Sequence, residues 1–304
     1  MKKKVFFYLP FIGLFLLVVA SFLLYLRIPF METWFYSFGW WSVILMMDGI
    51  NFRLQGSSFL FRSPRIFVEV AFLSVPVWLV FELINISLKN WMYLDLPNST
   101  LERWAGYFIA FATVIPALIE LSELFQGLLP KKRRPLFEFK TSPFLRRAMF
   151  FLGILFLIVA MTWPRYGFPL VWICFILILE PLNIKNNQKS LLREIEQGHL
   201  RLFWSWCLAG FCAGVIWEFL NFYAGAKWIY SIPYFDFIHI FEMPLLGYLG
   251  FIPFALEIFA VLQLYLYLKN KISHKSALKS FFFSAAVLFD LIVFHLIDVH
   301  TSQL

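Results

Sequence analysis

Residues 215–235, "VIWEFLNFYAGAKWIYSIPYF", begin as an apolar helix and end in a short polar and aromatic turn. Glu218 and Asn221 stand three positions apart, so both side chains project from one face of that helix. A glycine, a lysine and a Trp-x-Tyr sequence, Trp228 and Tyr230, follow at once. A helix that only anchors a chain in a membrane needs none of these groups, so the stretch predicts a specialised element.

The chain around this stretch is far more apolar than a soluble domain. Of its 304 residues, 61% are hydrophobic and 14% are charged, whereas about 25% of the residues in a soluble domain are charged. Apolar runs of about 18 residues or more recur along the chain and indicate an all-α, polytopic membrane protein. We expect nine spans, near residues 5–26, 36–52, 66–86, 104–126, 147–163, 167–183, 202–223, 243–268 and 280–298.

The basic residues lie mostly on one side of these spans. All but five of the 26 Lys and Arg fall in the loops on the side of the N-terminus, and cytoplasmic loops carry such an excess. We therefore expect a bacterial-type inner-membrane protein with its N-terminus in the cytoplasm and its C-terminus outside. Because the basic residues lie in short loops between the spans, the net charge of +8 does not indicate that the protein binds nucleic acid. The expected partners are membrane lipids, and no oligomeric state is predicted.

The opening stretch has a counterpart, "VFELINISLKNWMYLDLP", at residues 80–97. The match extends in both directions at offsets of about 132 to 137 residues. The matched pairs, first half before second, are Asp48 and Glu180, Asn51 and Asn183, Glu82 and Glu218, Asn85 and Asn221, Trp91 and Trp228, Tyr93 and Tyr230, Pro116 and Pro253, and Glu120 and Glu257. Each unit holds four spans, an even number, so the sequence predicts a parallel repeat.

The repeat divides the chain into four parts. Residues 1–130 form the first four-helix repeat, 131–146 a basic cytoplasmic linker, 147–270 the second repeat, and 271–304 a C-terminal span.

The acids inside the apolar spans are the candidate catalytic groups. A charged side chain at the centre of a membrane costs about 2.5–3.5 kcal/mol or more, so such acids stay protonated, share protons or bind a cation. The candidate acids and bases are Glu82, Glu218, Glu242 and Glu257. The candidate substrate-binding residues are Asn85, Asn221, Trp91, Tyr93, Trp228, Tyr230 and Lys227. The amides also fit a role as caps of the span ends, and the aromatic residues also fit a membrane-interface belt.

Two further local patterns lead to expectations. Pro116 and Pro253 each precede a glutamate by four positions, and proline inside a helix kinks it. His239 precedes Glu242 by three positions, so the two side chains could pair on one turn. The chain contains no metal-ligand spacing and no nucleotide, haem or redox motif, so we expect neither a metal nor a cofactor.

The second copy also carries a pattern with a known counterpart. An acid, Glu218, is followed by Gly225 and then by Trp228 and Tyr230, and Glu242 and Pro244 open the next span; this order resembles the integral membrane lycopene cyclases, both the small heterodimeric bacterial type and its fused archaeal and fungal relatives. The family has two glutamates after the proline, whereas here Glu242 stands before it. The resemblance implies a mechanism in which a buried acid protonates a polyene and the cation closes a ring, without net redox change.

Three functions therefore fit the sequence. The first is a membrane enzyme that acts on a lipid-soluble, isoprenoid-like substrate by acid–base chemistry. The second is a cation transporter or proton-coupled permease that uses the same carboxylates, since duplication and intramembrane acids are typical of transporters. The third is a structural subunit whose polar residues only hold helices together.

Overall fold

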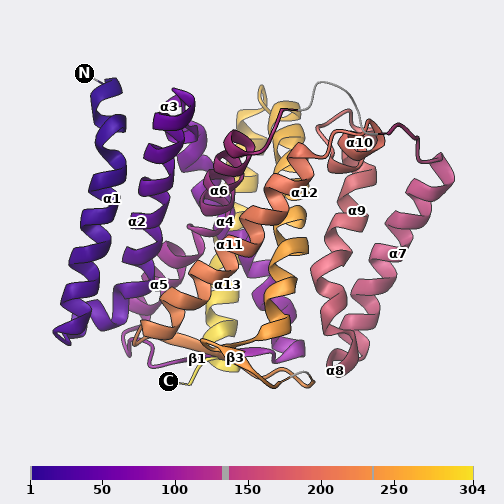
Figure 1. The fold of residues 1–304 in the computed structure, drawn as a ribbon. Helices are drawn as coiled ribbons and strands as arrows, with labels where there is room; N and C mark the ends of the chain where they lie inside the picture. The colour runs from indigo at the N-terminus through magenta and orange to yellow at the C-terminus, as the bar shows by residue number, and fades with distance from the viewer. Residues whose placement is uncertain (1, 132–136, 235, 304) are drawn as a thin grey trace.

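The computed structural model describes residues 2–131, 137–234 and 236–303, so the predicted linker 131–146 lies partly outside the described residues. The described chain is a bundle of helices with short strands at one end (Figure 1). Within it, eight helical segments are long and apolar enough to cross a membrane. The expected all-α membrane protein is confirmed at this level.

The helices and strands of the described chain divide into two halves and a last helix. The first half contains α1 (Lys2–Tyr25), α2 (Pro29–Gln55), α3 (Phe59–Arg62), α4 (Pro64–Leu88), β1 (Trp91–Leu94), α5 (Thr100–Phe111) and α6 (Val114–Leu128). The second half contains α7 (Pro143–Thr162), α8 (Pro164–Gly167), η1 (Phe168–Leu170), α9 (Val171–Lys185), α10 (Leu191–Glu196), α11 (Arg201–Tyr223), β2 (Lys227–Tyr230), β3 (His239–Ile240), β4 (Met243–Pro244), η2 (Leu245–Gly250) and α12 (Phe251–Lys271). The last helix is α13 (Ser276–His300).

The second expected span, 36–52, lies within the longer helix α2. This helix has 27 residues, which corresponds to about 40 Å at 1.5 Å per residue, and it packs along α1 (Figure 1). It is not among the eight apolar segments, and it carries Glu32, Asp48 and Arg53. The helix is therefore long enough to cross a membrane, but it is more polar than the eight apolar segments.

The expected proline kinks take another form. Pro116 lies in the first turn of α6, directly after the helical chain breaks at Ala112 and Thr113. Pro253 lies in the first turn of α12, directly after the 3-10 helix η2. Proline is well tolerated in a first turn, where its missing N–H has no helical partner. Each proline thus begins a new helix after a break.

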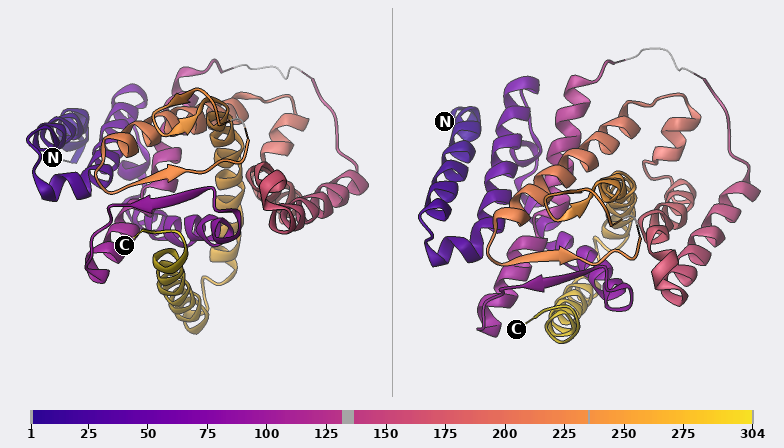
Figure 2. Two further views of the ribbon diagram at one scale, coloured as in Figure 1. Left: turned by 90° about the horizontal axis from the view of Figure 1, so that it is seen from below. Right: turned by 60° about the horizontal axis from the view of Figure 1, so that its bottom comes forward.

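The strands join the two halves at the end of the bundle where the C-terminus lies (Figures 1 and 2). Strands β1 and β2 pair antiparallel, with Met92 opposite Ile229. The pairing is symmetric about this point, because Trp91 faces Tyr230 and Tyr93 faces Trp228. The chain after α13 continues this sheet, since the Tyr93 N–H donates to the carbonyl oxygen of Thr301 at 2.7 Å.

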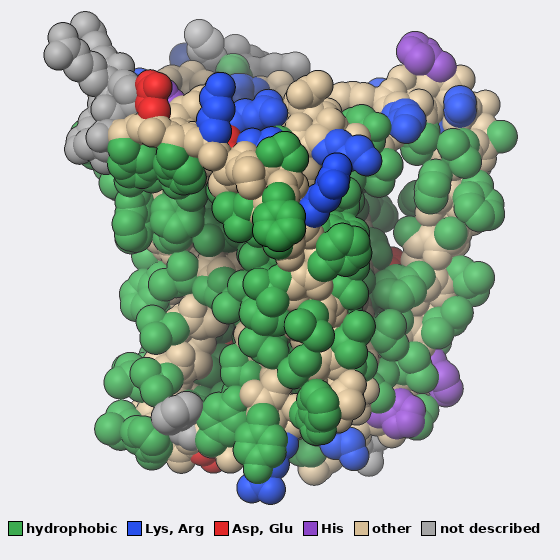
Figure 3. Space-filling view, turned by 90° about the vertical axis from the view of Figure 1, so that its right-hand side faces the viewer, with side chains coloured by type: hydrophobic (Ala, Val, Ile, Leu, Met, Phe, Trp, Pro, Cys, Tyr) green, Lys and Arg blue, Asp and Glu red, His purple; other side chains and the backbone are tan. Residues whose placement is uncertain are grey.

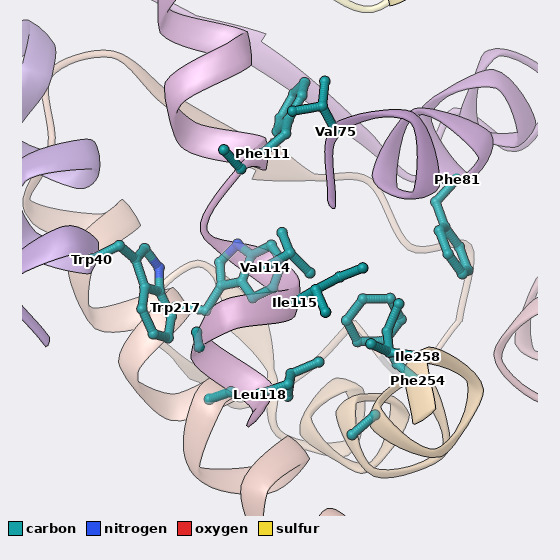
Figure 4. Packing of buried hydrophobic residues seen from close by; sticks show 14 of the residues in the cluster. Trp40, Val75, Phe81, Phe111, Val114, Ile115, Leu118, Trp217, Phe254 and Ile258 are labelled. Carbon is teal, nitrogen blue, oxygen red and sulfur yellow. The ribbon is translucent and has the colours of Figure 1, made fainter. Parts of the chain in front are cut away.

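The hydrophobic core lies between the halves, and aliphatic side chains pack there around a group of aromatic rings (Figure 4). The Trp217 ring of α11 lies 5.1 Å from Trp78 of α4 and 6.2 Å from Trp40 of α2, measured between centroids. Phe254 of α12 contacts both Trp78 and Trp217. The face of the molecule seen in Figure 3 is covered mostly by apolar side chains, with Lys and Arg gathered toward its two ends. This distribution fits a protein surrounded by lipid.

The loop before α7 is held by a carboxylate at the other end of the bundle. Glu196 accepts hydrogen bonds from the backbone N–H and hydroxyl of Thr141 and from the Arg146 guanidinium. Burial alone would raise the pKa of the Glu196 carboxyl, but these hydrogen bonds and the Arg146 charge outweigh it and lower the pKa. The ionised form is therefore favoured in the folded protein.

This lowered pKa predicts acid-dependent stability. Glu196 contributes stability that is fully present above about pH 4.3, the value for an unfolded chain, and that is lost as the pH falls through the lower pKa of the folded state. Glu196→Gln should therefore reduce the unfolding free energy by about 1.5–3 kcal/mol at pH 7. Thermal unfolding of the purified protein across pH measures this. The melting curves of variant and wild type should converge at low pH, and a constant difference would contradict the assignment.

Candidate functional site

A cavity of about 160 Å³ lies beside β1 and β2, between the two halves. Its wall is mostly aromatic and takes residues from α2, α4, α5, α11 and α12 as well as from both strands. The aromatic lining residues are Trp34, Tyr36, Trp78, Trp91, Tyr93, Tyr107, Phe111, Phe168, Trp172, Trp217, Trp228, Tyr230, Phe251 and Phe254. A concave, largely apolar site with a few fixed polar groups is the usual form of a small-molecule site.

Glu82 lies directly behind this wall and is completely buried. Its carboxyl group accepts hydrogen bonds from the Tyr93 hydroxyl at 2.5 Å and from the indole N–H of Trp78 at 2.8 Å. The indole N–H of Trp91 contacts both carboxyl oxygens, at 3.1 and 3.2 Å. Three donors that line the cavity therefore converge on one acid, and such a set fixes the orientation of a carboxylate.

Glu218 takes the matching place in the second half but has fewer partners. The Tyr230 hydroxyl donates to its Oε1 at 2.6 Å, while its Oε2 is buried and has no hydrogen-bond partner within the described chain. The position that matches Trp78 is Gly214, where a Cβ would lie 2.3 Å from the Phe251 ring. Glycine therefore admits Phe251 in place of a donor. The two acids are equivalent in position and different in hydrogen bonding.

Both tyrosines face the cavity with their hydroxyl groups protonated. Burial and the neighbouring Glu82 carboxyl raise the pKa of Tyr93 well above its ordinary value. Burial and the neighbouring Glu218 carboxyl raise the pKa of Tyr230 in the same way. Each phenol is thus held as a hydrogen-bond donor between a buried acid and the cavity.

The candidate amides Asn85 and Asn221 hold the strands in place and do not line the cavity. The Asn85 side chain accepts from the Asn90 N–H at 2.9 Å and donates to the Trp91 carbonyl oxygen at 2.9 Å. Asn221 makes the same pair of bonds with the N–H and carbonyl of Trp228, both at 2.9 Å. Their role in the structure is to position the Trp-x-Tyr strands, as expected for caps at span ends.

Removal of one amide should therefore destabilise the end of the bundle that carries the strands. Asn85→Ala leaves buried backbone groups of Asn90 and Trp91 without partners, which costs about 1–3 kcal/mol. The unfolding free energy in detergent measures this loss. Asn186→Ala, at a turn at the other end of the bundle for which no side-chain hydrogen bond is described, serves as the control. An Asn85→Ala protein as stable as the control would show that the amide does not hold β1.

Lys227 and Glu242 form an ion pair of 2.5 Å beside the cavity, and of the two only Lys227 lines it. The expected pairing of His239 with Glu242 is wrong, because His239 instead contacts Asp236 at 2.9 Å. The ladder of β3 and β4 explains this, since it sets His239 opposite Pro244 and directs Glu242 toward β2.

The fourth candidate acid, Glu257, lies away from the cavity. It is completely buried and accepts a hydrogen bond from the Phe175 backbone N–H of α9 at 2.9 Å. Its other carboxyl oxygen has no partner within the described chain. The structure therefore brings together Glu82, Glu218 and the four strand aromatics, with Lys227 beside them, and leaves Glu257 apart.

An ion pair on the cavity wall could not be predicted from the sequence. The Arg103 guanidinium, which lines the cavity, binds both carboxyl oxygens of Asp298 at 2.7 Å. The same carboxylate accepts from the Trp104 indole at 2.9 Å and the Tyr107 hydroxyl at 3.0 Å. Arg103 and Asp298 are 195 positions apart, and nothing in their spacing marks them as partners.

The comparisons with known proteins add nothing to this geometry. No family model matches the chain, and neither the curated proteins nor the solved structures contain a match. The chemistry of the site therefore follows from its own residues.

Proposed function

We propose that the protein is a membrane enzyme that moves a proton to and from an uncharged, lipid-soluble substrate, without net redox change. One observation carries the proposal: Tyr93 and Tyr230 both line a single aromatic cavity, and each is hydrogen-bonded to a buried glutamate. A phenol bonded to a carboxyl group is a standard arrangement for proton transfer.

The two acids are suited to different roles. Glu82 is fixed by three donors, so we assign it an electrostatic and positioning role. Glu218 has one oxygen without a hydrogen-bond partner in the described part of the chain, and a proton can occupy that oxygen. In the proposed step the protonated Glu218 carboxyl group turns so that its O–H donates to the Tyr230 oxygen, which reverses the bond that Tyr230 donates in the structure. Tyr230 then gives its own proton to the substrate as it takes the proton of Glu218. Loss of a proton from the substrate reverses this chain, so the number of protons on the enzyme is restored.

The charges at the cavity favour an uncharged substrate. Its two cationic lining residues, Arg103 and Lys227, are each paired with a carboxylate. The remaining wall is mostly aromatic, and aromatic faces stabilise positive charge that develops on a substrate. An isoprenoid-like molecule is uncharged, and it can carry a positive charge while it reacts, so it fits both the paired cations and the aromatic wall.

We also infer that the two halves arose by duplication and that α2 is a ninth span. Three sets of matched hydrogen bonds support the duplication: those of Glu82 and Glu218 with tyrosine, those of Asn85 and Asn221 with the strands, and those of Asp48 and Glu180 with Ser58 and Ser190. With nine spans and the basic loops on one side, we propose an inner-membrane protein with its N-terminus in the cytoplasm.

A proton-coupled transporter is the second candidate. The observation that favours it is the presence of buried acids toward both ends of the bundle, Asp48 and Glu120 at one and Glu82 and Glu218 at the other. A structural subunit is the third. The enzyme is favoured over the transporter and the structural subunit, because two tyrosines that are each bonded to a buried glutamate line one enclosed cavity.

Lipid extraction tests the enzyme proposal against the transporter. Extracts of cells with and without the gene are compared by mass spectrometry. The enzyme predicts that one lipid-soluble compound declines and that an isomer of the same mass accumulates. Identical profiles would overturn the proposal, and ion or proton flux in vesicles that depends on the protein would then favour transport.

A further inference from the structure

A second cluster of buried polar groups lies at the opposite end of the bundle, where the N-terminus is. It consists of Asp48 and Asn51 of α2 and Glu120 of α6, and all three are completely inaccessible to solvent. It is separate from the aromatic cavity, since none of the three lines it. The proposed function makes no use of these residues.

The hydrogen bonds distinguish the two acids. The Asp48 carboxyl accepts from the Ser58 hydroxyl and from the Leu60 backbone N–H, each at 2.9 Å. These are two donors of the kind that stabilise an ionised carboxylate. Glu120 accepts from the Asn51 amide at 2.8 Å through one oxygen, while its Oε1 and the Asn51 Oδ1 are buried and have no hydrogen-bond partner among the described residues.

The carboxyl groups of Asp48 and Glu120 are close enough for each to act on the protonation of the other. Ionised carboxylates carry only acceptor atoms, so a hydrogen bond between them requires a proton on one of the two. Asp48 already has donors on both oxygens, whereas Glu120 has an oxygen with none. The geometry therefore places the proton on Glu120.

Nearby charges do not replace this proton. Arg62 of α3 pairs with Glu123 of α6, and its charge also acts on Asp48, the acid that already has two hydrogen-bond donors, so it does not replace a proton on Glu120. The elements packed against α2 and α6 carry few other charges. They are Arg65, Glu69 and Glu82 of α4, Glu102 and Arg103 of α5, Arg201 and Glu218 of α11, and Lys4 of α1. Of these, Glu69 is paired with Arg65 and Lys269, and Arg103 is paired with Asp298.

The second half lacks this arrangement and supplies a natural comparison. Glu180 accepts from the Ser190 hydroxyl at 2.6 Å and the Leu192 N–H at 2.8 Å, as Asp48 does from Ser58 and Leu60. The Asn183 amide, however, donates to the carbonyl oxygen of Ala260, where Asn51 meets Glu120. The second acid of the pair is thus replaced by alanine, and Glu257 lies three residues away from that position.

We propose that Asp48, Asn51 and Glu120 form a binding site for one exchangeable proton at the end of the bundle that holds the N-terminus. The proton lies on Glu120 and is donated to Asp48, and it links α2 to α6. Its release leaves two buried negative charges in contact, so release loosens the packing of these two helices. This site is independent of the chemistry at the aromatic cavity.

Glu120→Gln tests the site because glutamine has the shape of the protonated acid and can donate to Asp48. Since the folded protein binds this proton and the unfolded chain releases it at neutral pH, wild-type stability should fall as the pH rises through the release. The melting temperature of Glu120→Gln should stay constant over that range. Infrared difference spectra between low and high pH should show a protonated-carboxyl band in wild type that is missing in Glu120→Gln.

Glu180→Gln is the matched control, because Glu180 accepts a hydrogen bond from Ser190 as Asp48 does from Ser58, and the described structure places no second acid in the position of Glu120. This variant should keep the pH dependence and the infrared band of the wild type. The proposal is overturned if Glu120→Gln also keeps both. It is equally overturned if NaCl, compared with choline chloride at constant pH, stabilises the wild type and not Glu120→Gln, since the ligand is then a metal cation.

Discussion

Replacement of Glu218 by glutamine is expected to lower formation of the lipid product by at least about 100-fold, the usual contribution of a positioned acid or base. Glutamine keeps the size of the side chain and can still accept the Tyr230 hydrogen bond, which is 2.6 Å long in the wild type. It cannot supply a proton to Tyr230 in exchange. The loss should therefore be chemical, with the fold unchanged.

The measurement is product formation in membranes from cells that express each variant at equal levels. Tyr230→Phe should lose activity to a similar extent, because it removes the hydroxyl that joins Glu218 to the cavity. Glu180→Gln, a buried acid at the other end of the bundle, is the control and should keep wild-type activity. If Glu218→Gln and Glu180→Gln form equal amounts of product, Glu218 has no part in the chemistry.

Breaking the Arg103–Asp298 pair is expected to cause the largest loss of stability. Both side chains are more than nine-tenths buried, and removal of one partner from a buried pair leaves an uncompensated charge that costs about 3–5 kcal/mol. Arg103→Met should therefore lower the unfolding free energy by that amount. The effect should reach β1, because the chain that follows α13 pairs with Tyr93.

The double variant Arg103→Met with Asp298→Leu separates charge from packing. Replacement of both partners by apolar groups is often neutral or stabilising, so the double variant should recover most of the lost stability. Unfolding in a constant detergent mixture, followed by tryptophan fluorescence, measures all three proteins. A double variant no more stable than Arg103→Met would show that the pair matters for its shape and not for its charge balance.

The positions of side chains along a single helix or strand were predictable from the sequence. The acid-x-x-Asn spacing placed Glu82 with Asn85 and Glu218 with Asn221 on the same helix faces, and both pairs lie at the expected span ends. The Trp-x-Tyr matches predicted which residues stand in equivalent strands. Spacing of three or four residues has a fixed meaning on a helix, so these features carry over directly into structure.

Contacts between distant helices were not predictable in this way. The sequence shows neither that Arg103 meets Asp298 nor that Gly214 admits Phe251 where Trp78 supplies a donor. It matched Glu120 with Glu257, yet Asn183 meets the carbonyl of Ala260. Such contacts depend on the rotation and offset of whole helices, which the breaks before Pro116 and Pro253 change by several residues.

Deuterium incorporation tests the central claim most directly. Membranes containing the protein are incubated with lipid extract in D₂O, and the products are analysed by mass spectrometry. If Glu218 and Tyr230 add a proton to the substrate, the product gains deuterium with the wild type and gains none with Glu218→Gln. A product that forms in D₂O without deuterium, or that gains deuterium equally with Glu218→Gln, would contradict the account.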